Sequence, residues 1–224
     1  MISAILLSGG LGKRMLAKKP KQYLCLKEKP IIIHALEALL TYPLWSEIAI
    51  VCEEQYQSLF IPYQNQVKLR FALPGKERQD SVFSGLEALS PKTNLICIHD
   101  GARPLLLEKD LLSVINEARK RGAAALAVPI KTTIKECDQN QIVQRTLDRS
   151  FLWEVQTPQV LLYSLAKEGY QKITAQHKIA TDDVSLAEFL GHPVHLVLGS
   201  YSNIKITSPE DLLLAELLLK RIHG

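Results

Sequence analysis

Short apolar runs alternate with longer helix-like segments through the first half of the chain, and this rhythm is the strongest constraint on the fold. Segments of helical length and composition lie at residues 30–41, 77–89 and 108–121. Between them lie runs of strand length, at residues 4–7, 47–52, 67–73, 94–98 and 123–128. Such alternation is typical of a parallel sheet that helices cover on both faces. The sequence therefore predicts an α/β fold with a mostly parallel central sheet.

The first apolar run leads directly into a basic, glycine-rich stretch, SGGLGKRM at residues 8–15, which closes with PKQY at residues 20–23. Glycines let the backbone turn tightly, and the freed N–H groups of such a turn bind anions. Arg14 and Lys21 would add positive charge beside this turn. The spacing matches neither the Walker phosphate loop nor the dinucleotide fingerprint. The stretch therefore predicts a polyphosphate cradle, with a plain turn carrying a solvated basic face as the alternative.

Two further polar segments, residues 75–81 and 100–103, follow predicted strands. Ligands of open α/β sheets bind beyond the carboxyl ends of the strands, so we expect these segments to meet the glycine-rich loop in one cleft. Asp100 is the best candidate for a metal ligand, because Mg²⁺ commonly takes one or two carboxylates together with substrate phosphates. Its alternative role is to cap the turn that follows. Arg103 could pair with a phosphate or with a surface carboxylate.

Three more polar residues are weaker candidates. Lys205 lies on a predicted short strand, residues 203–207, and points away from its two isoleucine neighbours, so a solvated lysine is the alternative. Thr157 and Thr181 lie in polar segments that could contact a polyol phosphate. For both threonines, the pattern alone favours a turn or a helix cap.

The rhythm changes at residues 131–155, where we predict a β excursion from the main body. Two β segments, residues 132–135 and 142–147, flank the turn-forming sequence DQNQ at residues 138–141. An isolated hairpin is marginally stable in water, so we expect it to pack on something, most simply a second copy of the chain. Packing on the chain's own sheet is the alternative.

The remainder of the chain predicts helices at residues 161–176 and 182–190, a strand at 194–198 and a closing helix at 212–222. Ser208 and Asp211 have the spacing of a capping box at the start of that last helix, and Pro209 suits its first position. With 224 residues, the whole chain fits one domain, residues 1–224.

Composition narrows the partners and the compartment. A net charge of +4 suits anionic substrates but is too small and too scattered to indicate nucleic-acid binding. No apolar segment is long enough for export or for spanning a bilayer, so we expect no membrane partner. The four cysteines, Cys25, Cys52, Cys97 and Cys137, lack metal-site spacing and are expected to be reduced and mostly buried. Together these features favour a cytoplasmic protein.

Several short motifs follow one another along the chain: GLGKRM at residues 10–15, PKQY at 20–23, GxERxDSV at 75–82, HDxARP at 99–104, DRxxLW at 148–153, QTPQ at 156–159, TD at 181–182 and NIKIT at 203–207. Through them the chain resembles the 2-C-methyl-D-erythritol 4-phosphate cytidylyltransferase family over essentially its whole length. The resemblance implies a Rossmann-like nucleotidyltransferase fold with a protruding β-arm that forms a homodimer. It also implies that CTP and 2-C-methyl-D-erythritol 4-phosphate react, with Mg²⁺, to give the cytidine diphosphate alcohol and pyrophosphate.

The resemblance also implies roles for individual residues. Arg14 and Lys21 would stabilise charge at the α-phosphate, while Arg149 and Lys205 would hold the attacking phosphate, with Arg149 reaching the neighbouring subunit's site. The pocket of the alcohol phosphate would be lined by Arg103, Thr133, Thr157 and Thr181. Asp100 would bind the metal and the ribose region. The other nucleotide contacts would come from Ser8, Gly9, Gly10, Gly12, Gly75, Arg78 and Ser81.

This chemistry needs no general base, because the nucleophile is already a phosphate oxygen; positioning and charge neutralisation are the tasks. The chain departs from the family's usual pattern at Ser8-Gly9, Lys76, Gly101 and Asp183, which bears on nucleotide affinity. A ribitol 5-phosphate cytidylyltransferase is the alternative enzyme. A non-catalytic nucleotide-binding regulator is the alternative from another class, although the full set of cationic residues favours an enzyme.

Overall fold

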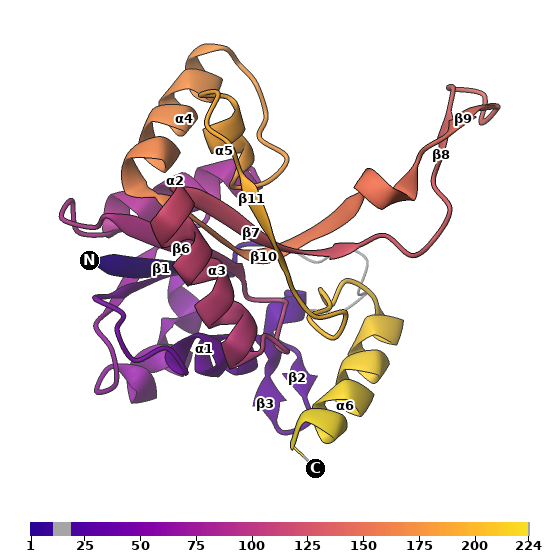
Figure 1. Ribbon diagram of the computed structural model, residues 1–224. Helices are drawn as coiled ribbons and strands as arrows, with labels where there is room; N and C mark the ends of the chain where they lie inside the picture. The colour runs from indigo at the N-terminus through magenta and orange to yellow at the C-terminus, as the bar shows by residue number, and fades with distance from the viewer. Residues whose placement is uncertain (11–18, 224) are drawn as a thin grey trace.

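The computed structural model describes residues 1–10 and 19–223. Its centre is a seven-stranded sheet in the order β11-β7-β10-β6-β1-β4-β5 (Figure 1). The strands are β1 (Ile2–Leu7), β4 (Ile48–Val51), β5 (Leu69–Ala72), β6 (Leu95–Asp100), β7 (Ala123–Pro129), β10 (Trp153–Leu162) and β11 (His195–Leu198). Strand β10 pairs antiparallel with β6 and β7, and every other pairing in the sheet is parallel. The predicted α/β class with a mostly parallel central sheet is confirmed.

Side chains of β1 alternate between two apolar layers, as a strand buried on both faces requires. Ala4 and Leu6 belong to the layer under α1 (Ile31–Leu40) and α3 (Glu108–Arg121). Ile5 and Leu7 belong to the layer under α2 (Arg78–Ala88), α4 (Tyr163–Ala175) and the short α5 (Ser185–Glu188). The helices therefore cover both faces of the sheet, as the alternating pattern predicts.

Strand β10 is the largest departure from the sequence prediction. The segment around Thr157 was expected to be a loop leading into a helix from residue 161. Instead it lies in the middle of the sheet, where Gln156, Thr157 and Gln159 are all buried. The prediction failed because polar side chains and a proline, Pro158, interrupt the apolar pattern of this strand. Each of those polar side chains finds a hydrogen-bond partner in another element, which compensates its burial.

Two predictions near the C-terminus are also wrong. The expected helix at residues 182–190 is only the single turn α5, because Asp182 and Asp183 form the bend that precedes it. The expected strand at 203–207 has no strand pairing; a hydrogen bond from Ile206 N to Ala102 O is its link to the loop after β6. The closing helix α6 (Pro209–His223) has the predicted capping box, since Asp211 accepts from Ser208 N at 2.9 Å.

Short elements complete the body. Strands β2 (Cys25–Leu26) and β3 (Lys29–Pro30) form a small hairpin beside α6, and Leu26, Ala215 and Leu219 share a third apolar cluster. The 3-10 segment η2 (Lys21–Tyr23) precedes this hairpin, and the 3-10 segment η3 (Glu54–Tyr63) follows β4.

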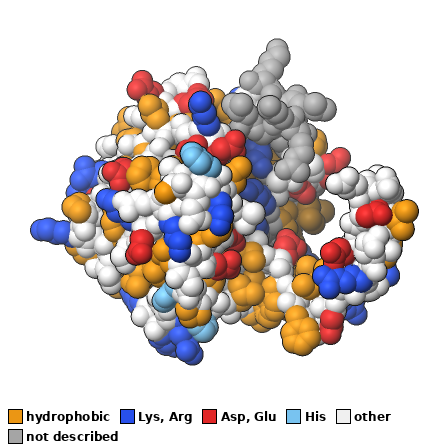
Figure 2. Space-filling view, turned by 90° about the horizontal axis from the view of Figure 1, so that it is seen from above, with side chains coloured by type: hydrophobic (Ala, Val, Ile, Leu, Met, Phe, Trp, Pro, Cys, Tyr) orange, Lys and Arg blue, Asp and Glu red, His pale blue; other side chains and the backbone are white. Residues whose placement is uncertain are grey.

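A two-stranded arm projects from the body between β7 and β10 (Figures 1 and 2). It consists of β8 (Lys135–Cys137) and β9 (Val143–Thr146), followed by the 3-10 turn η4 (Arg149–Phe151). The first strand lies slightly later than predicted. Nearly all arm side chains are exposed, and the Phe151 side chain is 82% exposed. The arm therefore does not pack on the described part of its own sheet.

Two of the four cysteines, Cys52 and Cys97, are buried, whereas Cys25 and Cys137 are exposed, so the expectation of mostly buried cysteines holds only for half of them. All four are free thiols. In the part of the chain that the structure describes, no helix has both the length and the apolar composition required to cross a bilayer.

Candidate active site

A cavity of about 360 Å³ opens at the carboxyl ends of β1 and β6. The expected convergence of the strand-end segments on one cleft is confirmed. The described residues that line it include Ser8, Gly9, Gly10, Lys21, Gln22, Gly75, Lys76, Arg78, Ser81, Asp100 and Lys205. Figure 2 shows basic side chains along the hollow between the body and the arm.

Gln22 and Tyr23 hold the start of the glycine-rich loop. The Gln22 side-chain amide donates to Ser8 O at 2.5 Å and to Gly10 O at 3.1 Å. The Ser8 hydroxyl donates to the Tyr23 hydroxyl at 2.6 Å, and the Tyr23 ring stacks on Tyr56. The PKQY motif thus shapes the loop through Gln22 and Tyr23 while Lys21 lines the cavity. Gly12 and Arg14, both predicted site residues, lie outside the described residues.

The turn before α2 forms the second wall of the cavity. Gly75 N donates to the Ser81 hydroxyl oxygen at 3.0 Å, and Glu77 and Asp80 form a capping box at the helix start. A Cβ on Gly75 would lie 2.2 Å from Asp80 Cβ, so this tight turn requires glycine. The arrangement projects Arg78, the first residue of α2, toward the end of β6.

Asp100, the last residue of β6, is the electrostatic centre of the site. Its Oδ2 lies 2.6 Å from Lys205 Nζ and 4.0 Å from Arg103 Nε, and its Oδ1 accepts from Arg78 Nη2 at 3.1 Å. Burial favours a raised pKa for Asp100, but the charges of Arg78, Lys205 and Arg103 hold that pKa well below its ordinary value. Asp100 is therefore a carboxylate at neutral pH, and its partner Lys205 lines the same cavity.

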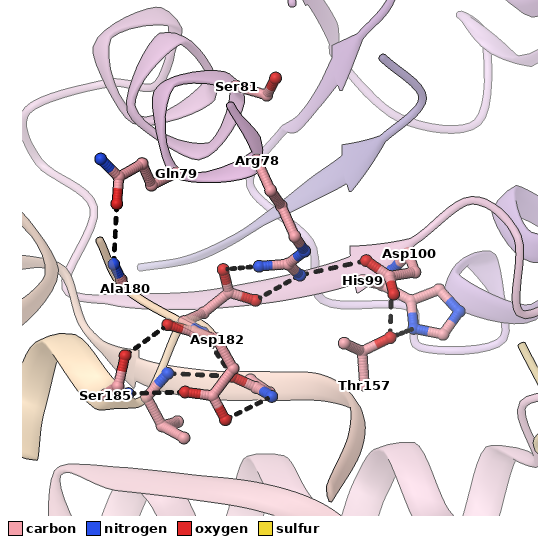
Figure 3. Close-up of polar contacts among 12 residues, drawn as sticks. Arg78, Gln79, Ser81, His99, Asp100, Thr157, Ala180, Asp182 and Ser185 are labelled. Atoms are coloured by element: carbon pink, nitrogen blue, oxygen red, sulfur yellow. Dashed lines mark hydrogen bonds and ion pairs between the residues drawn. The ribbon is translucent and has the colours of Figure 1, made fainter. Parts of the chain in front are cut away.

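Arg78 bridges two carboxylates (Figure 3). Its terminal nitrogens pair with both oxygens of Asp183, with Nη2 to Oδ2 at 2.8 Å, in addition to the bond to Asp100. Burial works against its charge, but the two carboxylates raise the pKa of Arg78 above its ordinary value. The sequence placed Asp183 in a polar segment that could contact a polyol phosphate, and marked it as a departure from the family pattern. Its role in the site was missed, because only the fold brings it to Arg78.

Thr157 is hydrogen-bonded to both Asp100 and His99 (Figure 3). Burial lowers the pKa of His99 to about 4, so the imidazole is neutral. Its Nε2 lies 3.0 Å from the Arg103 carbonyl and must donate there, which leaves Nδ1 to accept from the Thr157 hydroxyl at 3.0 Å. Thr157 in turn accepts from Asp100 N at 3.0 Å. The expected role of Thr157 as a pocket-lining residue is therefore wrong in this structure: its hydroxyl fixes the end of β6.

Arg103 is also placed differently from the prediction. It is buried behind Asp100 and donates to Asn203 O at 2.7 Å, so it does not line the cavity among the described residues. Asn203 Nδ2 donates to Thr157 O at 2.9 Å and to Gln156 Oε1 at 3.2 Å. These bonds fix the segment that carries Lys205 against β10.

Three remaining predicted residues lie away from this cavity. Thr181 is exposed in the bend before α5. Thr133 and Arg149 lie on the arm, where Arg149 donates to Lys131 O at 2.6 Å. None of the three lines the cavity of this chain among the described residues.

The donor set fits a divalent cation only in part. No group of three or more His, Cys, Asp or Glu side chains suited to a metal ion occurs among residues 1–10 and 19–223. Asp100 supplies one ionised carboxylate in the cavity. A hard cation such as Mg²⁺ takes few protein carboxylates when substrate phosphates complete its shell. The site therefore fits an ion that arrives with a polyphosphate rather than one held by the protein alone.

Known proteins match nearly the whole chain. The family model for 2-C-methyl-D-erythritol 4-phosphate cytidylyltransferase matches residues 2–221. A chloroplastic protein of that name from Oryza sativa subsp. japonica is 48% identical over 97% of this chain and 74% of its own length. A protein of the same name from Chlamydia trachomatis serovar D is 46% identical over 98% of this chain and 95% of its own length.

Solved structures agree with this match. The crystal structure of 4-diphosphocytidyl-2C-methyl-D-erythritol synthase from Anaerococcus prevotii is 31% identical and superposes with a TM-score of 0.85, covering 98% of both chains. That of 2-C-methyl-D-erythritol 4-phosphate cytidylyltransferase from Thermus thermophilus is 28% identical, with a TM-score of 0.79, and covers 98% of this chain and all of the other.

Proposed function

This chain belongs to the 2-C-methyl-D-erythritol 4-phosphate cytidylyltransferase family, and we propose that it is a nucleotidyltransferase that joins CTP to 2-C-methyl-D-erythritol 4-phosphate. The products are 4-diphosphocytidyl-2-C-methyl-D-erythritol and pyrophosphate, an intermediate and by-product of non-mevalonate isoprenoid synthesis. One observation carries the proposal. Lys21, Lys205, Arg78 and the first residues of the glycine-rich loop, Ser8 to Gly10, line one cavity together with the ionised carboxylate of Asp100.

In this reaction an oxygen of the alcohol phosphate forms a bond to the α-phosphorus of CTP, while the bond from that phosphorus to the pyrophosphate oxygen breaks. The nucleophile is already an anion, so no proton has to be removed. The barrier comes from bringing two anions together and from charge on the transferring group. A cationic cavity lowers both costs, which is why the arrangement around Asp100 suits this chemistry.

Membership of this family supports the following individual roles. Lys21, together with Arg14, would neutralise charge at the α-phosphate, and Lys205 would hold the attacking phosphate. Asp100 would hold Mg²⁺ together with the phosphates of CTP. When bound, the cation would neutralise charge on the triphosphate. Thr157 and Arg103 would act behind the site by fixing Asp100 and the segment of Lys205, respectively.

The arm suggests a homodimer. Arg149 and Thr133 lie on it, outside the cavity of their own chain, and its exposed side chains include the apolar Ile142 and Phe151. We propose that the arm packs on a second copy and delivers Arg149 to that copy's site. Inactive Arg14→Ala and Arg149→Ala dimers, once mixed and allowed to exchange subunits, should regain part of the wild-type activity. No recovery despite demonstrated exchange would refute this assignment.

The four free cysteines suit a reducing compartment, and we propose the cytoplasm as the place of action. This proposal can be tested by fractionating cells that express the chain.

The decisive test of function uses the purified chain with CTP, MgCl₂ and either 2-C-methyl-D-erythritol 4-phosphate or ribitol 5-phosphate. We expect pyrophosphate release, and a product of the corresponding mass, with the first acceptor and little with the second. The reverse preference would assign the ribitol enzyme. CTP binding without release with either acceptor would assign a nucleotide-binding regulator.

A further inference from the structure

Arg78 is shared unequally between its two carboxylate partners. Asp183 takes hydrogen bonds from both terminal nitrogens of the guanidinium group, whereas Asp100 takes a single one, from Nη2 at 3.1 Å. The Asp100 and Asp183 side chains are almost completely buried, and the Arg78 side chain is one-third exposed. Asp183 does not line the cavity around Asp100, and its hydrogen bonds toward that cavity go to Arg78.

The position of Asp183 is itself fixed from behind. The side-chain oxygen of Gln159, on β10, accepts from Asp183 N at 2.8 Å and from Val184 N at 2.9 Å. The neighbouring Asp182 accepts from Ser185 N at 3.0 Å and closes the turn into α5. The carboxylate of Asp183 is therefore held opposite Arg78 by a residue of the central sheet.

This geometry controls what Asp100 can offer to a ligand. A guanidinium group pairs most strongly with a carboxylate through two parallel hydrogen bonds. If Asp183 did not occupy both terminal nitrogens, Arg78 could turn them toward Asp100 and cover both of its oxygens. Since Lys205 already contacts Oδ2, Asp100 would then have little capacity left for a nucleotide.

We propose that Asp183 is a positioning residue for nucleotide binding, which holds Arg78 in a two-bond pair and thereby keeps the Asp100 carboxylate accessible to the incoming CTP. The inference rests on the proposed use of CTP and adds a residue with no contact to the substrate. It also assigns a purpose to Gln159 of the QTPQ motif, which orients Asp183.

The test compares Asp183→Asn with Asp110→Asn, which makes the same chemical change on α3 and does not touch Arg78, Asp183 or Gln159. We expect Asp183→Asn to weaken CTP binding by about 10-fold or more, measured by calorimetry in MgCl₂. Losing a hydrogen bond between charged groups changes a dissociation constant by about that factor. The KM for CTP should rise by a similar factor. The KM for the acceptor should stay within about two-fold of wild type, because the proposed effect concerns the binding of CTP alone. Asp110→Asn should bind CTP as the wild type does.

A second variant separates positioning from simple loss of structure. Arg78→Lys keeps the positive charge and both carboxylates but cannot form the two parallel bonds, so we expect a comparable loss of CTP affinity. Adding Asp183→Asn to Arg78→Lys should then cost little more, because the effect of Asp183 passes through Arg78.

Unchanged CTP affinity in Asp183→Asn or in Arg78→Lys would overturn the inference. An undiminished effect of Asp183→Asn in the Arg78→Lys background would also overturn it, because Asp183 would then act by another route. Should Asp183→Asn not fold, Arg78→Lys alone decides. A wild-type chain that binds no CTP would instead refute the proposed function.

Discussion

Replacing Asn203 with alanine tests how the fold positions Lys205. Asn203 is fully buried, and its side-chain amide donates to Thr157 O at 2.9 Å and to Gln156 Oε1 at 3.2 Å. The alanine variant leaves both acceptors buried without this donor. An orphaned buried acceptor costs about 1–3 kcal/mol, so we expect a loss of about 3 kcal/mol in the free energy of unfolding. For a domain of this size, that loss lowers Tm by about 6–12 °C.

Urea unfolding followed by circular dichroism measures the stability, and the proposed pyrophosphate assay measures the consequence for Lys205, two residues away. We expect the KM for the acceptor phosphate to rise more than the KM for CTP. Asn116→Ala, on the exposed face of α3, is the matched control and should stay within about 0.5 kcal/mol of wild type. If Asn203→Ala were as stable as that control, the bonds from Asn203 would not hold this segment, and the reasoning would fail.

Three other changes test separate features. The pKa of His99 is about 4 in the folded chain, below its ordinary value of 6.5, so the unfolded chain binds more protons at pH values between these two. As the pH falls from 7 to 4, His99 should therefore lower the free energy of unfolding by about 3 kcal/mol. His99→Gln should flatten that dependence in urea melts at several pH values. Arg14→Ala should lower kcat about 100-fold or more in the pyrophosphate assay, and an unchanged kcat would remove Arg14 from the mechanism. Gly101→Ala should lower Tm, since its Cβ would lie 2.0 Å from Ile32 Cδ1 and 2.8 Å from Leu7 O; an unchanged melting curve would show that the backbone can shift there.

The sequence predicted the parts of the fold that depend on local pattern. The buried strands β1, β4, β6 and β7 each contain a continuous apolar run, and α3 begins and ends where its amphipathic pattern does. The capping box at Ser208 and Asp211 is likewise a local signal. Because ligands bind at the carboxyl ends of parallel strands, this level of information was also enough to predict that Asp100, Gly75 and Ser8 to Gly10 lie at one cavity.

The local sequence pattern could not predict strand β10. Its buried Gln156, Thr157 and Gln159 look like loop residues in the sequence, because the groups that satisfy them come from elements up to 58 positions away. A local pattern records whether a side chain is polar, not whether a distant partner will compensate its burial.

The amino-acid sequence by itself determined the α/β class and the family to which the chain belongs, since these depend on short motifs and local periodicity. Only the tertiary structure decided which polar residues line the cavity and which hold those residues in place from behind. It turned Thr157 and Arg103 away from the cavity to support Asp100, and it brought Asp183 to Arg78 across 105 positions. The physical reason is that a charge buried at the end of a strand must be neutralised and hydrogen-bonded by whichever groups the packing of the sheet brings beside it.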